Sequence, residues 1–245
     1  MKNTLKIAAL VLNFSLMSTA FASKVKPLAL VWNGEGVCQP GCDNSAADVA
    51  KKAGFRVQYV NEKTRDFSFF DTAKLWVQPG GVSVTAMRAM GPVLMQQVRE
   101  FVAGGGGYIG FCAGAFSATT KIGTTEKDGL GLMGGETELY KKGGDDHAMY
   151  LVKTKYFGKR WMYYAGGPFI KISDDELAAM KGEVIANYPD GSVAGVRGHY
   201  GKGKVAVVGF HPEATRLWKL AFRKWDKDGS DKLFAVDMAT YATTP

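Results

Sequence analysis

A cysteine flanked by small residues is the feature of this sequence best suited to covalent chemistry. Cys112 stands in Gly110-Phe111-Cys112-Ala113-Gly114-Ala115, between an apolar run and a helical pattern. A nucleophile on a strand-to-helix turn has a strained backbone, and Gly110 and Gly114 leave room for it. The helix N-terminus stabilises a thiolate, and the amide of Ala113 would point at a developing oxyanion. The motif predicts attack on a carbonyl, with a buried structural cysteine as the alternative.

A histidine motif could supply the matching base. His211 and Glu213 lie in Phe210-His211-Pro212-Glu213, just past another apolar run. An imidazole can take the thiol proton and later protonate the leaving group, and a carboxylate two residues on can fix its tautomer. The alternative for His211 by itself is an ordinary loop histidine. Together with Cys112 the pattern predicts a nucleophile, a base and an orienting acid.

A glycine pair is a candidate for the second oxyanion donor. Gln78-Pro79-Gly80-Gly81 follows a third apolar run, and a backbone without side chains can approach a substrate carbonyl closely. Taken alone, Pro-Gly-Gly is equally typical of a plain turn.

The elements that must position these residues alternate between strands and helices. Short apolar or alternating runs predict strands, and helical spacing of apolar residues predicts helices. We expect strands at 27–33, 55–60, 74–78, 107–111 and 205–210, and helices at 45–53, 91–103, 214–224 and 230–242. This order predicts an α/β fold with a mostly parallel sheet, whose strand carboxyl ends gather at one edge. Cys112 and His211 can therefore meet despite their separation in the chain.

The middle of the chain has a different pattern. Residues 121–200 are rich in glycine, with short alternating runs near 147–153, 161–172, 183–188 and 192–197. They predict strands and hairpins, a β-rich insertion in one α/β domain over residues 23–245.

The motifs and their order resemble the class I glutamine amidotransferase-like superfamily. The resemblance rests on Pro79-Gly80-Gly81, Gly110–Gly114 and the segment from Gly203 to Glu213. It is closer to the amidotransferase-like N-terminal domain of eukaryotic biotin–protein ligases and its stand-alone bacterial relatives. Trp32-Asn33-Gly34-Glu35-Gly36 is similar to that family's Tyr-Asn-Gly-Pro-Gly opening, and Tyr164–Phe169 to its Asn-Gly-Gly segment.

The resemblance implies a flavodoxin-like three-layer sandwich and a Cys–His–Glu triad. Cys112 is then the nucleophile, His211 the base and Glu213 its orienter, with Gly81 and Ala113 as oxyanion donors. Pocket residues are expected at Asn33, Gly80, Gly166 and Gly167. The sequence shows neither an ammonia-consuming synthase nor a biotin-ligase catalytic domain, so glutamine is not implied as the substrate.

The first 22 residues have the pattern of a secretory signal peptide. Lys2 and Lys6 precede a short apolar stretch, and Ala20-Phe21-Ala22 is a small-x-small cleavage site. An uncleaved membrane anchor is the alternative. We expect a periplasmic or secreted protein with no stable membrane insertion after cleavage.

Three cysteines among 245 residues exclude a disulfide miniprotein and a four-cysteine zinc site. Cys38 and Cys42 are close enough in sequence to bridge across a turn, which export favours. A redox-active pair is the alternative. Cys112 then remains as the free thiol.

The net charge of +8 becomes +6 once Lys2 and Lys6 are removed, and the lysines are scattered. A solvated basic surface explains this better than nucleic-acid binding, and the sequence does not determine the oligomeric state.

No metal or cofactor is expected. Asp226–Asp231 lacks the glycine and glutamate positions of a calcium loop and predicts a polar turn. Asp145, Asp146 and His147 predict a loop, Gly104–Gly107 is no dinucleotide fingerprint, and His199 is expected at the surface.

Three functions are compatible with these observations. The first is an exported cysteine hydrolase or amidase that acts on a small-molecule or peptide-like amide or ester. The second is a non-catalytic domain that binds a ligand or protein in the same pocket. The third is a thiol redox or peroxide sensor based on Cys112.

Overall fold

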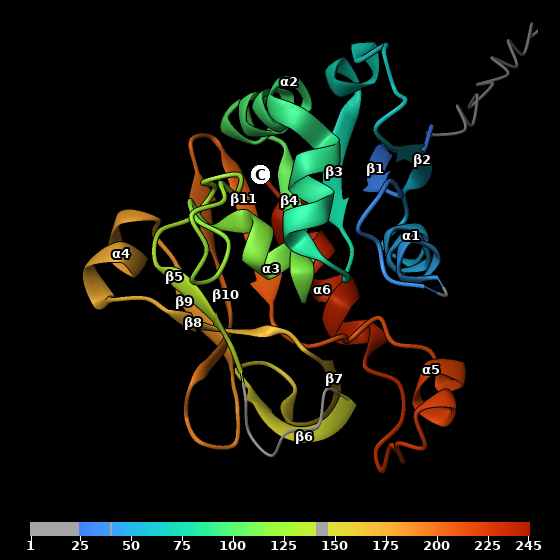
Figure 1. The fold of residues 1–245 in the computed structure, drawn as a ribbon, viewed down its shortest axis with the longest axis vertical. Coiled ribbons are helices and arrows are strands. Elements are labelled where there is room, and N and C mark those ends of the chain that lie inside the picture. The colour runs from blue at the N-terminus through green and yellow to red at the C-terminus, as the bar shows by residue number, and fades with distance from the viewer. Residues whose placement is uncertain (1–24, 40, 141–146) are drawn as a thin grey trace, which may run out of the picture.

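A twisted sheet of nine strands crosses the described part of the molecule (Figure 1). The computed structural model describes residues 25–39, 41–140 and 147–245. The expected signal peptide, and Asp145 and Asp146 of the candidate metal loop, lie outside the described residues. In sheet order the strands are β2-β1-β3-β4-β11-β10-β9-β6-β7.

Five parallel strands form one half of this sheet. They are β2 (Arg56–Val60), β1 (Leu28–Trp32), β3 (Ala73–Gln78), β4 (Gly107–Phe111) and β11 (Gly203–Val208). This order is that of flavodoxin-like folds, in which the chain reverses direction across the sheet between β1 and β3. The predicted α/β fold with a parallel central sheet is confirmed.

Antiparallel strands extend the sheet beyond β11. They are β10 (Val193–Tyr200), β9 (Glu183–Asn187), β6 (His147–Thr154) and β7 (Gly158–Ala165). A separate pair, β5 (Glu136–Leu139) and β8 (Pro168–Lys171), lies beside them with the short helix α4 (Asp174–Ala179). The β-rich middle predicted from the sequence is therefore largely an extension of the central sheet.

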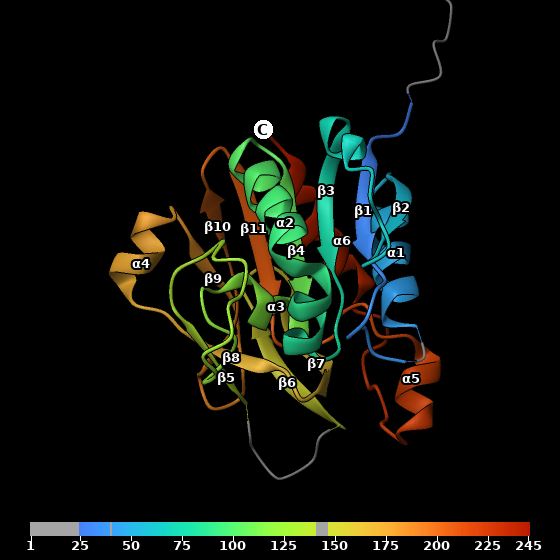
Figure 2. The ribbon, with the colours of Figure 1, turned by 45° about the horizontal axis from the view of Figure 1, so that its top comes forward.

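Helices cover both faces of the parallel strands (Figure 2). Helices α1 (Cys42–Lys52) and α6 (Lys232–Thr243) pack on one face, and α2 (Ser83–Ala103) and α3 (Ala113–Ala118) on the other. A 3-10 turn, Ser68–Asp71, precedes β3, and α5 (Arg216–Ala221) lies at the lower right in Figure 1. These layers make the three-layer sandwich.

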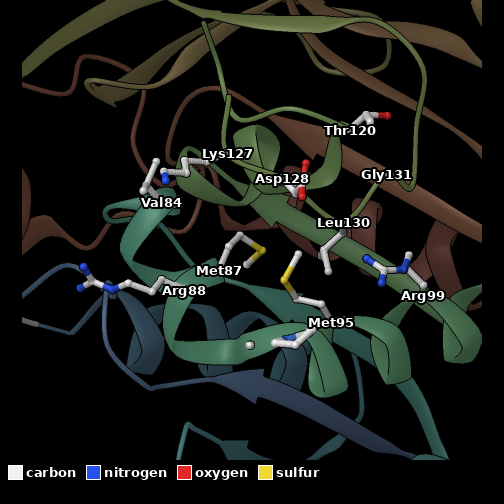
Figure 3. Close-up of a pocket in the computed structure, with 13 residues that line it drawn as sticks. Val84, Met87, Arg88, Met95, Arg99, Thr120, Lys127, Asp128, Leu130 and Gly131 are labelled. Atoms are coloured by element: carbon white, nitrogen blue, oxygen red, sulfur yellow. The ribbon is translucent and has the colours of Figure 1, made fainter. Parts of the chain in front are cut away.

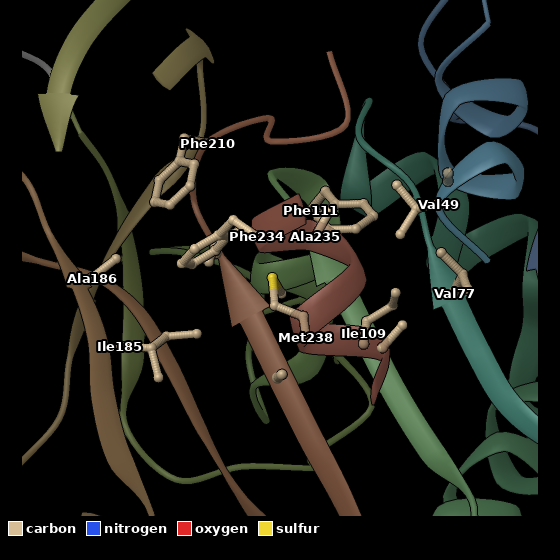
Figure 4. Close-up of a cluster of buried hydrophobic side chains, with 14 of the residues drawn as sticks. Val49, Val77, Ile109, Phe111, Ile185, Ala186, Phe210, Phe234, Ala235 and Met238 are labelled. Atoms are coloured by element: carbon tan, nitrogen blue, oxygen red, sulfur yellow. The ribbon is translucent and has the colours of Figure 1, made fainter. Parts of the chain in front are cut away.

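The parallel strands are apolar on both faces because both faces are covered. In β1, Ala29 and Val31 face the α1 and α6 side, whereas Leu28, Leu30 and Trp32 face the α2 side. Figure 4 shows the first of these cores, in which Phe234 and Met238 of α6 lie beside β4 and β11. The uninterrupted apolar runs in the sequence reflect this double burial.

Helix α2 is longer than the sequence predicted. It starts at Ser83 instead of Gly91, and Gly91 interrupts it with φ 67° and ψ 169°. Pro92 disfavours helical geometry at the residue before it, which makes the sequence pattern appear to begin there. The first segment is held by the burial of Met87 and Met90 against the sheet. Within the described ranges, no helix is long and apolar enough to cross a membrane.

Candidate active site

The carboxyl ends of three neighbouring parallel strands bring the predicted site residues together. Gly80 and Gly81 follow β3, Cys112 follows β4, and His211 and Glu213 follow β11. In the sheet β4 lies between the other two strands. Cys112 is therefore flanked by the glycine pair on one side and by the histidine segment on the other.

Cys112 has a backbone conformation that side-chain-bearing residues rarely adopt. Its φ is 51° and its ψ is −104°, at the turn from β4 into α3. Its amide donates to the carbonyl of Val208 on β11 at 2.8 Å, which fixes the turn to the sheet. A β-carbon on Gly110 would lie 2.6 Å from the Gly114 backbone, and one on Gly114 would overlap the Gln78 carbonyl oxygen. Both glycines are thus required for this strained turn.

The thiol of Cys112 is enclosed. Its residue is 2% exposed, and Sγ donates to the carbonyl oxygen of Ala165 at the end of β7, 3.5 Å away. The adjacent amide of Ala113 is the first of α3 and has no acceptor within the helix. A negatively charged oxygen beside Cys112 would therefore find an N–H donor.

His211 and Glu213 form a buried pair. Nδ1 of His211 lies 2.8 Å from Oε1 of Glu213, and both residues are at most 2% exposed. Within the described chain, Nε2 of His211 and Oε2 of Glu213 have no hydrogen-bond partner. Glu213 therefore orients the ring through Nδ1 and leaves Nε2 for another group.

The charges around His211 favour its protonated form. Burial lowers the pKa of His211, but the charges of Glu213 and Cys112 raise it to about 10. Cys112 is thus close enough to influence the imidazole directly. An imidazolium beside the sulfur is the arrangement that stabilises a thiolate.

The glycine pair after β3 has two separate structural roles. A β-carbon on Gly80 would overlap Cε1 of His211, so this glycine makes room for the imidazole. Gly81 has φ 141° and forms an antiparallel bridge with Val37. In this bridge the hydrogen bonds run from Cys38 to Gly80 and from Val82 to Gly36, at 3.1 and 2.7 Å. The N–H of Gly81 is left for another acceptor.

The loop after β1 carries a disulfide. Cys38 and Cys42 are bonded, with their α-carbons 5.4 Å apart. Cys42 begins α1, and Cys38 is hydrogen-bonded to Gly80. The disulfide therefore ties the glycine pair to α1, and Cys112 is the free cysteine.

A cavity of about 540 Å³ opens next to this site. His211, Gly81 and Ala165 are among its lining residues, whereas Cys112 itself is not. The opposite wall comes from α5 and the turn after it, with Leu217, Trp218, Ala221 and Phe222. A small molecule in this cavity would lie against the imidazole.

The sequence motifs do not predict the aromatic residues of this wall. The ring of Trp218 meets the His211 ring edge-on, with centroids 5.8 Å apart. Tyr163 lies 5.9 Å from His211 by centroid, and its hydroxyl is 2.7 Å from Nδ1 of His147. His147 in turn stacks on Phe222 at 3.6 Å. Aromatic enrichment at 161–164 and 217–225 was the available signal, but only the fold brings these segments together.

The other expected pocket residues lie apart from the cavity lining. Asn33 follows β1, and its side chain accepts a hydrogen bond from Asn61 at 3.4 Å. Gly166 has φ 67° and open space around it. Gly167 packs so closely on Gly209 that a β-carbon would overlap the Gly209 carbonyl oxygen. Gly167 therefore lets the end of β7 approach the strand that precedes His211.

The acidic segment before α6 holds the cavity wall in place. Lys219 of α5 is 4% exposed and pairs with Asp226 and Asp231. Asp228 accepts the Trp161 amide at 3.0 Å. The carboxylates thus have protein partners, and no cluster of three or more metal-ligand side chains occurs among the described residues. His199, on β10, is outside the cavity lining.

A larger cavity, about 830 Å³, lies between α2 and the loop around residues 120–131 (Figure 3). Met87 and Met95 form its floor, with Arg88, Arg99 and Lys127 around them. None of the predicted catalytic residues lines it. Size alone therefore does not select a candidate site, and Cys112, His211 and Glu213 converge beside the smaller cavity instead.

Comparison with known proteins gives a family-model match over part of the chain and fold matches over most of it. A model described as "Biotin-protein ligase, N terminal" matches residues 28–140. A crystal structure of a glutamine amidotransferase is 20% identical, with TM-score 0.61, and the match covers 86% of this chain and 99% of the other. PurLQS from Thermotoga maritima is 19% identical, with TM-score 0.58 and coverages of 88% and 99%. No curated protein matches the sequence.

The same fold also occurs as part of a larger protein. A β-galactosidase from the Antarctic haloarchaeon Halorubrum lacusprofundi matches 89% of this chain with 30% of its own length, at 14% identity and TM-score 0.55. At these identities the structural matches establish the fold alone.

The chain thus has a glutamine amidotransferase-like fold. Residues 28–140 match the model of the biotin–protein ligase N-terminal family, the family that the sequence motifs resemble.

Proposed function

We propose that this protein is an exported cysteine hydrolase that cleaves an amide or ester bond. The observation that carries the proposal is the strained Cys112 turn, φ 51° and ψ −104°, next to the 2.8 Å His211–Glu213 pair. Backbone strain of this kind persists only where the surrounding structure enforces it, and such residues cluster at active sites. In the proposed enzyme, the strained turn holds the nucleophile at the end of the strand, beside its base.

In the proposed reaction the sulfur of Cys112 attacks the substrate carbonyl carbon while His211 holds the thiol proton. The tetrahedral oxyanion is stabilised by the amides of Gly81 and Ala113. The imidazolium then gives its proton to the leaving amine or alcohol, and the carbon–nitrogen or carbon–oxygen bond breaks. A water molecule, deprotonated by His211, cleaves the resulting thioester and releases a carboxylic acid and the free thiol.

A non-catalytic binding domain is the second candidate. It is favoured by the enclosure of Cys112, which is 2% exposed and hydrogen-bonded to Ala165. The biotin–protein ligase N-terminal family is compatible with this role. In that case the cavity beside His211 would bind a ligand without covalent chemistry.

Alkylation of Cys112 tests the first candidate. Iodoacetamide at pH about 6.5 should label Cys112 at least about tenfold faster than a free thiol, because an adjacent imidazolium raises the thiolate fraction. His211→Ala should remove this advantage, whereas His199→Ala, outside the site, should retain it. Labelling no faster than a free thiol and unaffected by His211→Ala contradicts the hydrolase.

Turnover separates the two candidates. A panel of amides and esters should be hydrolysed by the wild type and not by Cys112→Ala. Fast Cys112 alkylation with no turnover of any panel member favours the binding domain.

The export part of the proposal rests on residues 1–22 and has its own test. Expressed as the full chain in a bacterium, the protein should be recovered outside the cytoplasm with Ser23 as its first residue. N-terminal sequencing checks this, and a cytoplasmic protein that retains Met1 contradicts it.

A further inference from the structure

The cavity beside His211 has a lining that restricts what it can bind. Among the described residues that line it, no side chain is Lys, Arg, Asp or Glu. The charge of His211 is already paired with Glu213, 2.8 Å away. A free amino acid brings an ammonium and a carboxylate, and burying either without a partner costs several kcal/mol. This lining therefore disfavours zwitterionic substrates.

The walls of the cavity are apolar on two opposite sides. Val37 and Val82 come from the loops that follow β1 and β3. Leu217, Trp218 and Phe222 face them from α5 and the following turn. The cavity volume of about 540 Å³ lies within the range of small-molecule sites, which are typically lined by apolar and aromatic groups.

The α5 segment exposes large apolar side chains beside the cavity. Leu217 is 76% exposed and Phe222 is 44% exposed, and both line the cavity. The segment is nevertheless fixed, because Lys219 on the same helix is buried in its pairs with Asp226 and Asp231. Exposed apolar side chains on a segment that is fixed in place are typical of a ligand-binding surface.

Uncharged or aromatic polar side chains complete the lining, on Gln39, Thr85, His147, Tyr163 and His211. The Gly81 amide is left unused by the Val37 bridge, and Nε2 of His211 is buried with no hydrogen-bond partner among the described residues. In the proposed reaction, the Gly81 amide would donate to the substrate carbonyl oxygen, and His211 would protonate one leaving-group atom. The rest of a bound molecule would contact the apolar walls.

We propose that the cavity selects an uncharged amide or ester with an apolar group the size of an aromatic ring next to the reacting carbonyl. This inference rests on the proposed function, because it assigns the substrate class of the same site. Trp218 and Phe222 would contact the apolar group, and the carbonyl would point toward Gly81.

A set of chloroacetamides with one reactive group and different tails tests the selection. The probes are chloroacetamide itself, N-(2-phenylethyl)chloroacetamide, N-(2-aminoethyl)chloroacetamide and N-chloroacetyl-β-alanine. The rate of adduct formation at Cys112 is measured by mass spectrometry and divided by the rate with N-acetylcysteine amide, a neutral free thiol. The division removes differences in intrinsic reactivity.

The phenylethyl probe should react at least about tenfold faster than chloroacetamide after this correction, as burial of a ring predicts. The cationic and anionic probes should be no faster than chloroacetamide. Trp218→Ala should reduce the phenylethyl-to-parent ratio toward one. Leu220→Ala, on the same helix but outside this cavity, should leave the ratio unchanged.

The outcomes separate the substrate class from the nucleophile. Fast labelling of Cys112 with equal or greater preference for a charged tail overturns the substrate class and leaves the nucleophile intact. A ratio unaffected by Trp218→Ala also overturns it. If no probe labels Cys112 faster than the free thiol, the proposed function fails, and the substrate class falls with it.

Discussion

The imidazole of His211 lies directly against the α-carbon of Gly80. A β-carbon on Gly80 would overlap Cε1 of His211 and stand 3.2 Å from its Nδ1. The two residues follow different strands, β3 and β11, with β4 and Cys112 between them. The position of the proposed base therefore depends on the absence of a side chain two strands away.

Gly80→Ala should displace His211 and slow the alkylation of Cys112. The added methyl occupies the place of the ring edge, so the imidazole must rotate away from the sulfur or from Glu213. We expect a loss of about tenfold or more in the alkylation rate, with fast labelling retained in Gly134→Ala. Gly134 has as its nearest neighbour the Glu176 side chain, 3.3 Å from an added β-carbon. An unchanged rate in Gly80→Ala would show that the ring position is irrelevant to the thiol.

Gly114→Ala should destabilise the protein, although it places alanine in a helix. Such a change normally stabilises a helix by about 1 kcal/mol. Here the methyl would overlap the backbone carbonyl of Gln78, which cannot rotate away. We expect a loss of about 2 kcal/mol or more in the free energy of unfolding, measured in urea. A stabilised variant would contradict the close approach of α3 to β3.

Glu213→Gln should change how stability depends on pH. Burial lowers the pKa of His211, but the charges of Glu213 and Cys112 raise it to about 10, against about 6.5 in an unfolded chain. The stabilising contribution of the protonated ring is complete below about pH 6.5 and is lost as the pH rises through about 10. The free energy of unfolding should therefore fall with rising pH in this window, by at most about 1.4 kcal/mol per pH unit.

Glutamine keeps the shape of Glu213 but removes its charge, so the variant should show a flatter curve. Urea unfolding at about pH 6.5, 8 and 9.5 compares the two proteins, and the difference between them isolates this pair from other titrating groups. Parallel curves would mean that Glu213 does not hold the proton on His211.

Loss of the Cys38–Cys42 disulfide should reduce stability and should also alter the site. A closed loop of five residues restricts the unfolded chain weakly, which corresponds to about 2 kcal/mol. The loop also lines the cavity through Val37 and Cys38 and is hydrogen-bonded to Gly80. We expect Cys38→Ser combined with Cys42→Ser to unfold at lower urea concentration and to lose part of the phenylethyl preference. A loss of stability with an unchanged preference would separate the disulfide from the cavity.

The local pattern of the sequence was sufficient for the parallel strands and for the turn that carries Cys112. Both faces of β1, β3, β4 and β11 are buried, so their apolar runs stand out without tertiary information. Gly110 and Gly114 are needed because each lies against other backbone atoms. Gly110 lies against the backbone of Gly114, and Gly114 lies against the carbonyl of Gln78 on the neighbouring strand. Such requirements can be recognised in the sequence because only glycine meets them. The proximity of His211 to Cys112 follows from the order of the parallel strands.

Helix α2 and the sheet extension show where local pattern fails. The segment from Ser83 to Met90 is helical because its methionines pack on the sheet, which no local period reveals beside Gly91 and Pro92. Likewise, alternation predicted strands in the glycine-rich middle but not that β10 pairs with β11 and extends the central sheet. Pairing between distant strands is a property of the folded chain.

The sequence alone thus determined the type of fold and the residues with reactive side chains, because each depends on local spacing and residue type. The tertiary structure decided what surrounds them. It packs Gly80 against His211, leaves Asn33 outside the cavity, and brings Trp218 and Phe222 opposite the disulfide loop. The cavity wall is assembled from segments that are more than 100 residues apart in the chain, and only the folded chain places such segments side by side.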